Sequence, residues 1–225
     1  MSVAEIAIDC RQPWLVARFA GPRRMLSWSP NRPGFAVADA VAWLEVTDAD
    51  VVDLSDPAGY LRARLAAASL QRAVGLMTAR DVRRHHLGHS TVDGIGATAL
   101  TTAGLTNGER IGERCTDPAL RAAAGTINTL VHVTVPLTRG AFLEAMSLAV
   151  QARTVAVAEA GIRRGGSIIT GTGTDCLVVA APPGPQPAVY AGLHTAIGEA
   201  VGAAVLSATR AAVAGWVADQ TGNAP

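Results

Sequence analysis

The most unusual local sequence in this chain is Thr170-Gly-Thr-Gly-Thr-Asp175, in which two glycines separate three hydroxyl side chains before a carboxylate. Glycine allows tight backbone turns that present N–H groups, and the hydroxyls and the carboxylate crowd the same point. Such a segment can bind an anion, stabilise an oxyanion or position a water molecule, or it can be a plain turn between two strands. A strand is predicted after it and it lacks lysine, so neither a dinucleotide fingerprint nor a Walker loop fits.

A histidine precedes the last apolar stretch of the chain, which is predicted to be a helix. At a helix N-terminus the dipole disfavours the imidazolium cation, so neutral His194 would be available as a base or a hydrogen-bond donor. Thr195 and Glu199 share one face of that helix at i, i+4 spacing. The alternative is that His194 only caps the helix.

Further polar residues stand out against apolar surroundings. On the helix predicted over residues 139–159, the polar side chains of residues 144, 147, 151 and 154 recur at spacings of three and four, so they share one face. This stripe either faces water or lines a polar cleft. Asn107 and Asn128 follow tight turns; each amide can donate and accept hydrogen bonds, or can simply form the turn.

Two other candidates carry weaker signals. In His85-His-Leu-Gly-His89 an i, i+4 histidine pair would suit a metal on a helix, but Gly88 and the neighbouring Ser and Asp favour a loop. No cluster of carboxylates or cysteines supports it, so we expect no metal. Cys176 could be a nucleophile that acts with His194, although its spacing is equally that of a small core residue.

Composition excludes several mechanisms. All 19 basic residues are arginine, which excludes a lysine Schiff base, a pyridoxal phosphate enzyme and a lysine general base. A net charge of +1 provides no basic field for a nucleic acid or a membrane surface. The longest uncharged stretch, 176–198, contains four prolines and cannot be one spanning helix, and no signal peptide is expected. Three widely spaced cysteines without a CxxC pair predict a cytoplasmic protein.

The 225 residues, 49% of them hydrophobic, can bury a large core. Residues 1–54 are predicted to be mainly strands and turns, with one strand ending at Gly21-Pro22, and Asp56-Pro57 is predicted to start a helix that reaches about residue 71. Strands are predicted near 74–79, 92–102, 126–135, 168–170 and 176–180, and helices over 139–159, with Gly161 as C-cap, and 191–218. The prediction is a single α+β domain over residues 1–225, with mixed β-sheet(s) packed against about three helices, including a long C-terminal helix.

Six segments in order, spread over about residues 25–212, resemble the adenosylcobinamide amidohydrolase family of cobamide salvage. They are Leu26-Ser27, Gly75-Leu-Met-Thr-Ala79, Thr102-Ala-Gly-Leu-Thr-Asn107, Gly125-Thr-Ile-Asn128, Thr170-Gly-Thr-Gly-Thr-Asp175 and Tyr190-Ala-Gly-Leu-His194, the last continuing to Glu199. The resemblance implies hydrolysis of the aminopropanol amide of adenosylcobinamide to give adenosylcobyric acid. The corrinoid is then a substrate, with no cofactor, and the protein can form a homo-oligomer.

A mechanism follows from this resemblance as a hypothesis. Asp175 and His194 would move protons for an attacking water molecule, and backbone N–H groups of residues 171–174 would stabilise the oxyanion. A threonine nucleophile in the same segment is the alternative. The expected substrate-binding residues are Ser27, Asn107, Asn128, Gln151, Thr170, Gly171, Thr172, Gly173, Thr174 and Glu199.

One departure from the family's pattern matters for the chemistry. Where the family carries Thr-Glu-Ala-Lys, this chain has Val150-Gln-Ala-Arg153. If the family's glutamate moves a proton, Gln151 cannot replace it; if that glutamate only binds a substrate amide, Gln151 can. A non-catalytic corrinoid-binding or small-molecule-binding protein and an amidohydrolase for a different amide are therefore the competing interpretations.

Overall fold

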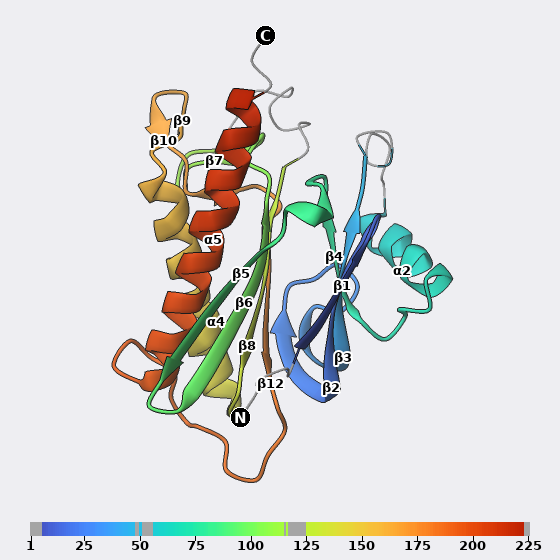
Figure 1. Cartoon of the computed structure of the whole chain (residues 1–225), viewed down its shortest axis with the longest axis vertical. Helices are drawn as coiled ribbons and strands as arrows, with labels where there is room; N and C mark the ends of the chain where they lie inside the picture. Colours follow the sequence, from blue (N-terminus) through green and yellow to red (C-terminus); the bar gives the residue numbers. More distant parts are fainter. Residues whose placement is uncertain (1–5, 48–49, 51–55, 115, 117–124, 223–225) are drawn as a thin grey trace.

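A bent mixed sheet organises the chain, of which the computed structural model describes residues 6–47, 50, 56–114, 116 and 125–222. Within these residues the sheet has eight strands in the order β4-β3-β2-β12-β8-β6-β5, with β1 paired to β2 (Figure 1). The strands are β1 (Ile6–Arg11), β2 (Trp14–Ser27), β3 (Gly34–Glu45), β4 (Val74–Thr78), β5 (His86–Val92), β6 (Ile95–Ala103), β8 (Ile127–Val133) and β12 (Cys176–Ala181). Short pairs are formed by β7 (Gly108–Glu109) with β11 (Gly171–Thr172) and by β9 (Arg163–Arg164) with β10 (Ser167–Ile168).

The long strands β2 and β3 belong to both halves of the bent sheet. The first half of β2 pairs with β1 and its last residues pair with β12, and its register with β3 shifts between Arg18 and Arg23. The predicted strand end at Gly21-Pro22 is therefore wrong, because the strand continues through an irregularity that bends it. The two halves of the sheet face each other across a core that contains Trp43, Leu76 and Leu130.

Helices cover both outer faces of this folded sheet. On one side, α4 (Arg139–Glu159) and α5 (Ala196–Gly222) pack against each other and against the half that contains β12, β8, β6 and β5. On the other side, α2 (Pro57–Ala67) packs against the half that contains β3 and β4. Figure 1 shows the resulting order of four layers, helix, sheet, sheet and helix. The predicted α+β class, with about three helices and a long C-terminal helix, is confirmed.

The helix ends follow their capping residues. Asp56 accepts a hydrogen bond from the Gly59 N–H at 2.8 Å, with Pro57 in the first turn, so the predicted start of α2 is confirmed. The helix ends at Ala67, earlier than predicted. Gly161 follows α4 with a φ of +68°, as expected of a C-cap glycine. The last helix begins only at Ala196, because the Thr195 hydroxyl caps it through the Gly198 N–H at 3.0 Å.

The histidine-rich segment is a strand, which corrects the predicted loop. Residues 86–89 form the first part of β5, and Gly88 lies directly beneath α5. A Cβ atom at Gly88 would overlap the carbonyl oxygen of Ala204, so this glycine serves the close approach of helix to strand. By length and composition alone α4 and α5 could cross a membrane, but here about half of each apolar window is buried, 56% and 44% respectively, within the packed fold.

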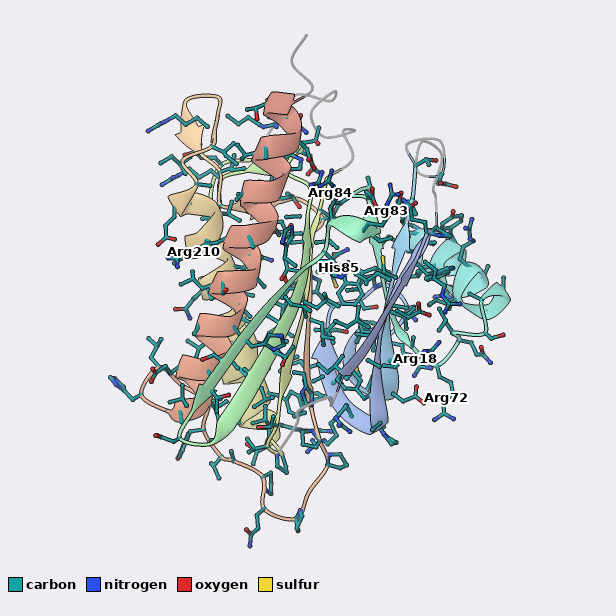
Figure 2. All side chains as sticks on the ribbon, in the orientation of Figure 1. Arg18, Arg72, Arg83, Arg84, His85 and Arg210 are labelled. Carbon is teal, nitrogen blue, oxygen red and sulfur yellow. The ribbon has the colours of Figure 1, made fainter. Side chains whose placement is uncertain are left out.

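Basic side chains are spread over separate parts of the surface (Figure 2). Arg18 and Arg72 lie on the side that carries α2, Arg83 and Arg84 lie in the short 3-10 helix η1 (Val82–Arg84), and Arg210 lies on α5. Several are paired: Arg83 with Asp81 at 2.7 Å, Arg84 with Asp219 at 3.5 Å and Arg210 with Glu159 at 2.7 Å. The arginines labelled in Figure 2 therefore do not form one continuous patch.

Candidate active site

A cleft of about 560 Å³ opens where the glycine-threonine segment meets the C-terminal half of α4. Residues 109–114 form one wall, residues 170–173 with Asp175 form another, and Val150, Arg153 and Thr154 of α4 complete it. The segment is held in place by backbone pairing of β11 with β7 and by the Thr170 N–H, which donates to the Glu109 carbonyl at 2.8 Å. Most of the unusual sequence thus lines one concave surface.

Asp175 is the polar centre of this cleft wall. It directly precedes β12, which runs parallel to β8, so its carboxylate lies beside the start of β8. Oδ1 accepts from the Ile127 N–H at 2.9 Å and from the Thr172 hydroxyl, and Oδ2 accepts from the Thr172 N–H at 3.0 Å. The side chain is only 7% exposed. The carboxylate therefore fixes the turn, and the Thr172 N–H is not available to an oxyanion, contrary to the expected role of that backbone group.

Arg153 reaches the same carboxylate from α4. Its Nη1 lies 3.3 Å from Asp175 Oδ2, and the residue is 9% exposed. Nε and Nη1 are buried without a hydrogen-bond partner, so the ion pair compensates the charge but leaves N–H groups unbonded. A buried guanidinium in this state has hydrogen-bonding capacity left for another acceptor.

The three threonines of the segment have different partners. The Thr170 hydroxyl accepts from the Ile111 N–H at 2.7 Å, and the Thr174 hydroxyl donates to the Gly125 carbonyl at 2.9 Å. Of the three, Thr172 donates to a carboxylate, and it also lines the cleft. Donation to a carboxylate polarises a hydroxyl toward nucleophilic attack. Thr172 is therefore the threonine best placed for covalent chemistry.

The structure does not bring together His194 and Asp175, the predicted proton-handling pair. His194 is exposed, in the turn before α5. That turn is fixed to the first half of α4 by the Ala191 N–H, which donates to Glu144 at 2.6 Å. Arg153, beside Asp175, lies nine residues further along the helix, or about 13 Å at the helical rise. His194 and Asp175 therefore lie beside different halves of α4.

Two other predicted substrate-binding residues lie on exposed helix surface outside the cleft. Gln151 is exposed and donates to the Ser147 hydroxyl at 3.2 Å, so this part of the polar stripe faces water. Only Thr154 of the stripe lines the cleft. Glu199 is exposed in the first turn of α5, at the same end as His194.

Three predicted binding residues are instead buried supports of neighbouring loops. The Asn128 side chain donates to the Met77 carbonyl at 2.6 Å, and the Ser27 hydroxyl donates to the Arg32 carbonyl at 3.2 Å. Asn107 is 8% exposed and packs closely against Gly125, where a Cβ atom would lie 2.5 Å from Asn107 Oδ1. The Asn128 amide and the Ser27 hydroxyl join loops of several motif segments, whereas Asn107 Oδ1 is buried without a hydrogen-bond partner among the described residues. None of the three residues lines the cleft.

The remaining candidates do not form a catalytic group. Burial raises the pKa of the Cys176 thiol to about 12, so the thiol stays neutral and is a poor nucleophile. Across the described parts of the chain, no group of three or more His, Cys, Asp or Glu residues could hold a metal ion. Sequence reasoning did not assign Arg153 or residues 109–114 to the site. For the wall of the cleft that α4 contributes, the signal in the sequence was the i, i+3 spacing of Val150 and Arg153, which places both side chains on one face of the helix.

Comparison with known proteins identifies the class. The family model described as adenosylcobinamide amidohydrolase matches residues 1–221. Because the match covers nearly the whole chain, the protein belongs to the adenosylcobinamide amidohydrolase family, which are hydrolases of a carbon–nitrogen bond, and the resemblance of the six segments is confirmed. A search of curated proteins found no match.

Two solved structures are similar at 11% sequence identity. The PH0078 protein from Pyrococcus horikoshii OT3 has a TM-score of 0.45, with 89% of this chain and 77% of that chain covered. The L-aminopeptidase D-Ala-esterase/amidase from Ochrobactrum anthropi has a TM-score of 0.40, with 93% of this chain and 82% of that chain covered.

Proposed function

We propose that this amidohydrolase cleaves the aminopropanol amide of adenosylcobinamide and releases adenosylcobyric acid. The observation that carries the proposal is the family match over residues 1–221. The family implies a corrinoid substrate, and the cleft beside Asp175 is the place where an amide would meet polar groups. Asp175 and Thr172 are the residues proposed to act on it.

The size of the cleft supports a particular mode of binding. Sites of roughly 300–1,000 Å³ enclose drug-sized ligands, and a corrin macrocycle with its adenosyl group is larger than such a ligand. A cleft of about 560 Å³ therefore takes the aminopropanol arm and its amide, while the ring stays outside. Trp28 offers a surface for the ring, because its indole is 43% exposed and its Nε1 donates to the Asp175 carbonyl at 2.6 Å.

The chemistry starts from the hydrogen bond between Thr172 and Asp175. The attacking oxygen is the Thr172 hydroxyl, or a water molecule in its place, and its proton passes to the Asp175 carboxylate. Attack on the amide carbon forms a tetrahedral intermediate; its collapse breaks the C–N bond, and the proton leaves with the amine as aminopropanol. With threonine as nucleophile, water then hydrolyses the resulting ester to the carboxylic acid.

The departure at position 151 does not favour the non-catalytic interpretation. Gln151 is exposed and does not line the cleft, so a change there removes no proton-handling group from the proposed site. A corrinoid-binding protein without activity remains the outcome if the chain binds adenosylcobinamide and releases nothing.

The test is hydrolysis by the purified chain. Adenosylcobinamide is incubated with the protein, and aminopropanol and adenosylcobyric acid are measured by mass spectrometry. We expect stoichiometric release by the wild type and a loss of at least about 100-fold in Asp175→Asn, since general-base catalysis contributes this much. Ser147→Ala, an exposed change on α4, is the control and should keep the wild-type rate.

The variants Thr172→Ser and Thr172→Val distinguish attack by the Thr172 hydroxyl from attack by a water molecule. If Thr172 is the nucleophile, serine retains activity and valine abolishes it; if water attacks, valine retains partial activity. A wild-type rate in Asp175→Asn would refute the proposed site, and absence of product with the wild type would refute the proposed reaction.

A further inference from the structure

Arg153 combines burial, a charge and unused hydrogen-bond donors at the wall of the cleft. Nε and Nη1 are buried without a hydrogen-bond partner, although Nη1 lies 3.3 Å from Asp175 Oδ2. The side chain is still 11% exposed and lines the cleft, which leaves Nη2 as the polar atom that can meet a ligand there. No hydrogen bond joins Nη2 to another group in the described part of the chain.

The ion pair with Asp175 does not account for this arrangement by itself. The carboxylate already accepts three hydrogen bonds from Ile127 and Thr172, and none comes from Arg153. A structural arginine usually forms a bidentate pair with its carboxylate. Here the Arg153 guanidinium lies beside the carboxylate, which compensates its charge, but its N–H groups have no acceptor among the described residues. Burying unbonded N–H groups costs free energy, and a bound acceptor would offset that cost.

The cleft has room for an acceptor beside this guanidinium. A Cβ atom at Gly171 would overlap Asp175 Oδ2 at 2.7 Å and lie 3.8 Å from Arg153 Nη2, so only a residue without a side chain fits there, whereas a Cβ atom at Gly173 would meet no atom within 4 Å. The backbone on both sides of Thr172 is thus glycine, which lets a ligand approach the hydroxyl and the guanidinium together. An oxygen bound to Nη2 would lie next to the carbon that the Thr172 hydroxyl, or a water in its place, attacks.

We propose that Arg153 binds the carbonyl oxygen of the scissile amide as it becomes an oxyanion, and then one oxygen of the product carboxylate. This inference rests on the proposed function. The substrate amide is neutral, whereas the tetrahedral intermediate and the product are anionic. A permanently charged guanidinium therefore binds the later states more tightly than the substrate, which is the requirement for acceleration.

The test compares Arg153→Gln and Arg153→Lys with the wild type in kcat, KM and ligand binding. For Arg153→Gln we expect kcat to fall by about 100- to 1,000-fold with KM changed less than about threefold, as for loss of an oxyanion donor. Binding of adenosylcobyric acid should weaken by about tenfold or more, while binding of the corresponding primary amide should not change. Arg153→Lys keeps a charge beside Asp175 and should lie between the two.

Comparing the acid with the primary amide shows whether Arg153 recognises the carboxylate or the corrinoid as a whole. Equal weakening of the acid and the amide, or unchanged binding of the acid by Arg153→Gln, would overturn the proposal. If Arg153→Gln does not fold, as judged by circular dichroism, Arg153→Lys provides the test. It must still bind the acid more tightly than the amide, by a smaller factor than the wild type does, and a wild-type kcat in it would also overturn the role. Acid-over-amide preference is measured without turnover, so it remains readable if the wild type proves inactive.

Discussion

One carboxylate holds several segments of this chain together. Asp175 accepts from Ile127 at the start of β8 and from Thr172 in β11, and it faces Arg153 of α4. The same contacts place a hydroxyl, a carboxylate and a guanidinium within one cleft wall. Positioning and chemistry are thus provided by the same side chain, so its asparagine variant must be checked for folding as well as for activity.

Trp28 provides a prediction about binding of the substrate ring. If the corrin ring rests on this indole, Trp28→Ala should raise KM by about tenfold, corresponding to roughly 1.4 kcal/mol of lost apolar contact, with a smaller change in kcat. Trp28→Phe should keep most of the affinity. Leu193→Ala, at a side chain that is 73% exposed beside His194, is the matched control. An unchanged KM in Trp28→Ala would place the ring elsewhere.

At the scale of elements, the contact of α5 with β5 depends on one glycine. Gly88→Ala should destabilise the protein by about 1–3 kcal/mol, because the added methyl would overlap the Ala204 carbonyl. Gly202→Ala, within α5, is a control for which we expect the opposite sign, since its Cβ would meet nothing within 4 Å. It should stabilise the helix by about 1 kcal/mol. Thermal melting measures both, at about 2–4 °C per kcal/mol for a chain of this size.

How far the sequence predicts the fold depends on whether a signal is local. The Asp56 cap, the Gly161 cap and the apolar run of β8 are local signals, and the start of α2, the end of α4 and the strand β8 lie where they were expected. Gly21-Pro22 and Gly88 were misread as breaks, because their roles are to bend a strand and to admit a helix, and both roles depend on partners distant in sequence.

The same limit applies to the site. The composition of residues 170–175 identified one wall of the cleft. The structure does not place His194 beside Asp175, and spacing along the chain does not show which half of α4 a helix start will contact. Arg153 was noticed as a departure from the family, yet its contact with Asp175 requires the packing of α4 on β12.

At the scale of the whole molecule, His132 predicts how stability depends on pH. It lies buried between the two halves of the sheet, beside Phe19, and burial and then the charge of Arg23 lower its pKa to about 4. In the unfolded protein the histidine has a pKa near 6.5. Between that pH and about 4 it is therefore protonated in the unfolded protein and neutral in the folded one. Stability should therefore fall as the pH drops from about 6.5 to about 4, by about 3 kcal/mol, and this contribution should then level off.

Denaturant melts of the wild type and His132→Asn across this range measure the effect. The variant should lose that part of the pH slope, whatever its stability at neutral pH. His89→Gln, at an exposed position, should keep the slope. A wild-type slope in His132→Asn would assign the acid sensitivity to other groups.

The strand order has a consequence for how the protein is made. The central strand β12 lies between β2 and β8, although it is synthesised long after both. Until residue 181 has left the ribosome, the edges of β2 and β8 that will receive β12 have no partner, and an unpaired edge invites pairing with other chains. The emerging chain therefore cannot complete its sheet from the N-terminus onward, and its last quarter is the segment whose arrival ends the period of exposure to aggregation.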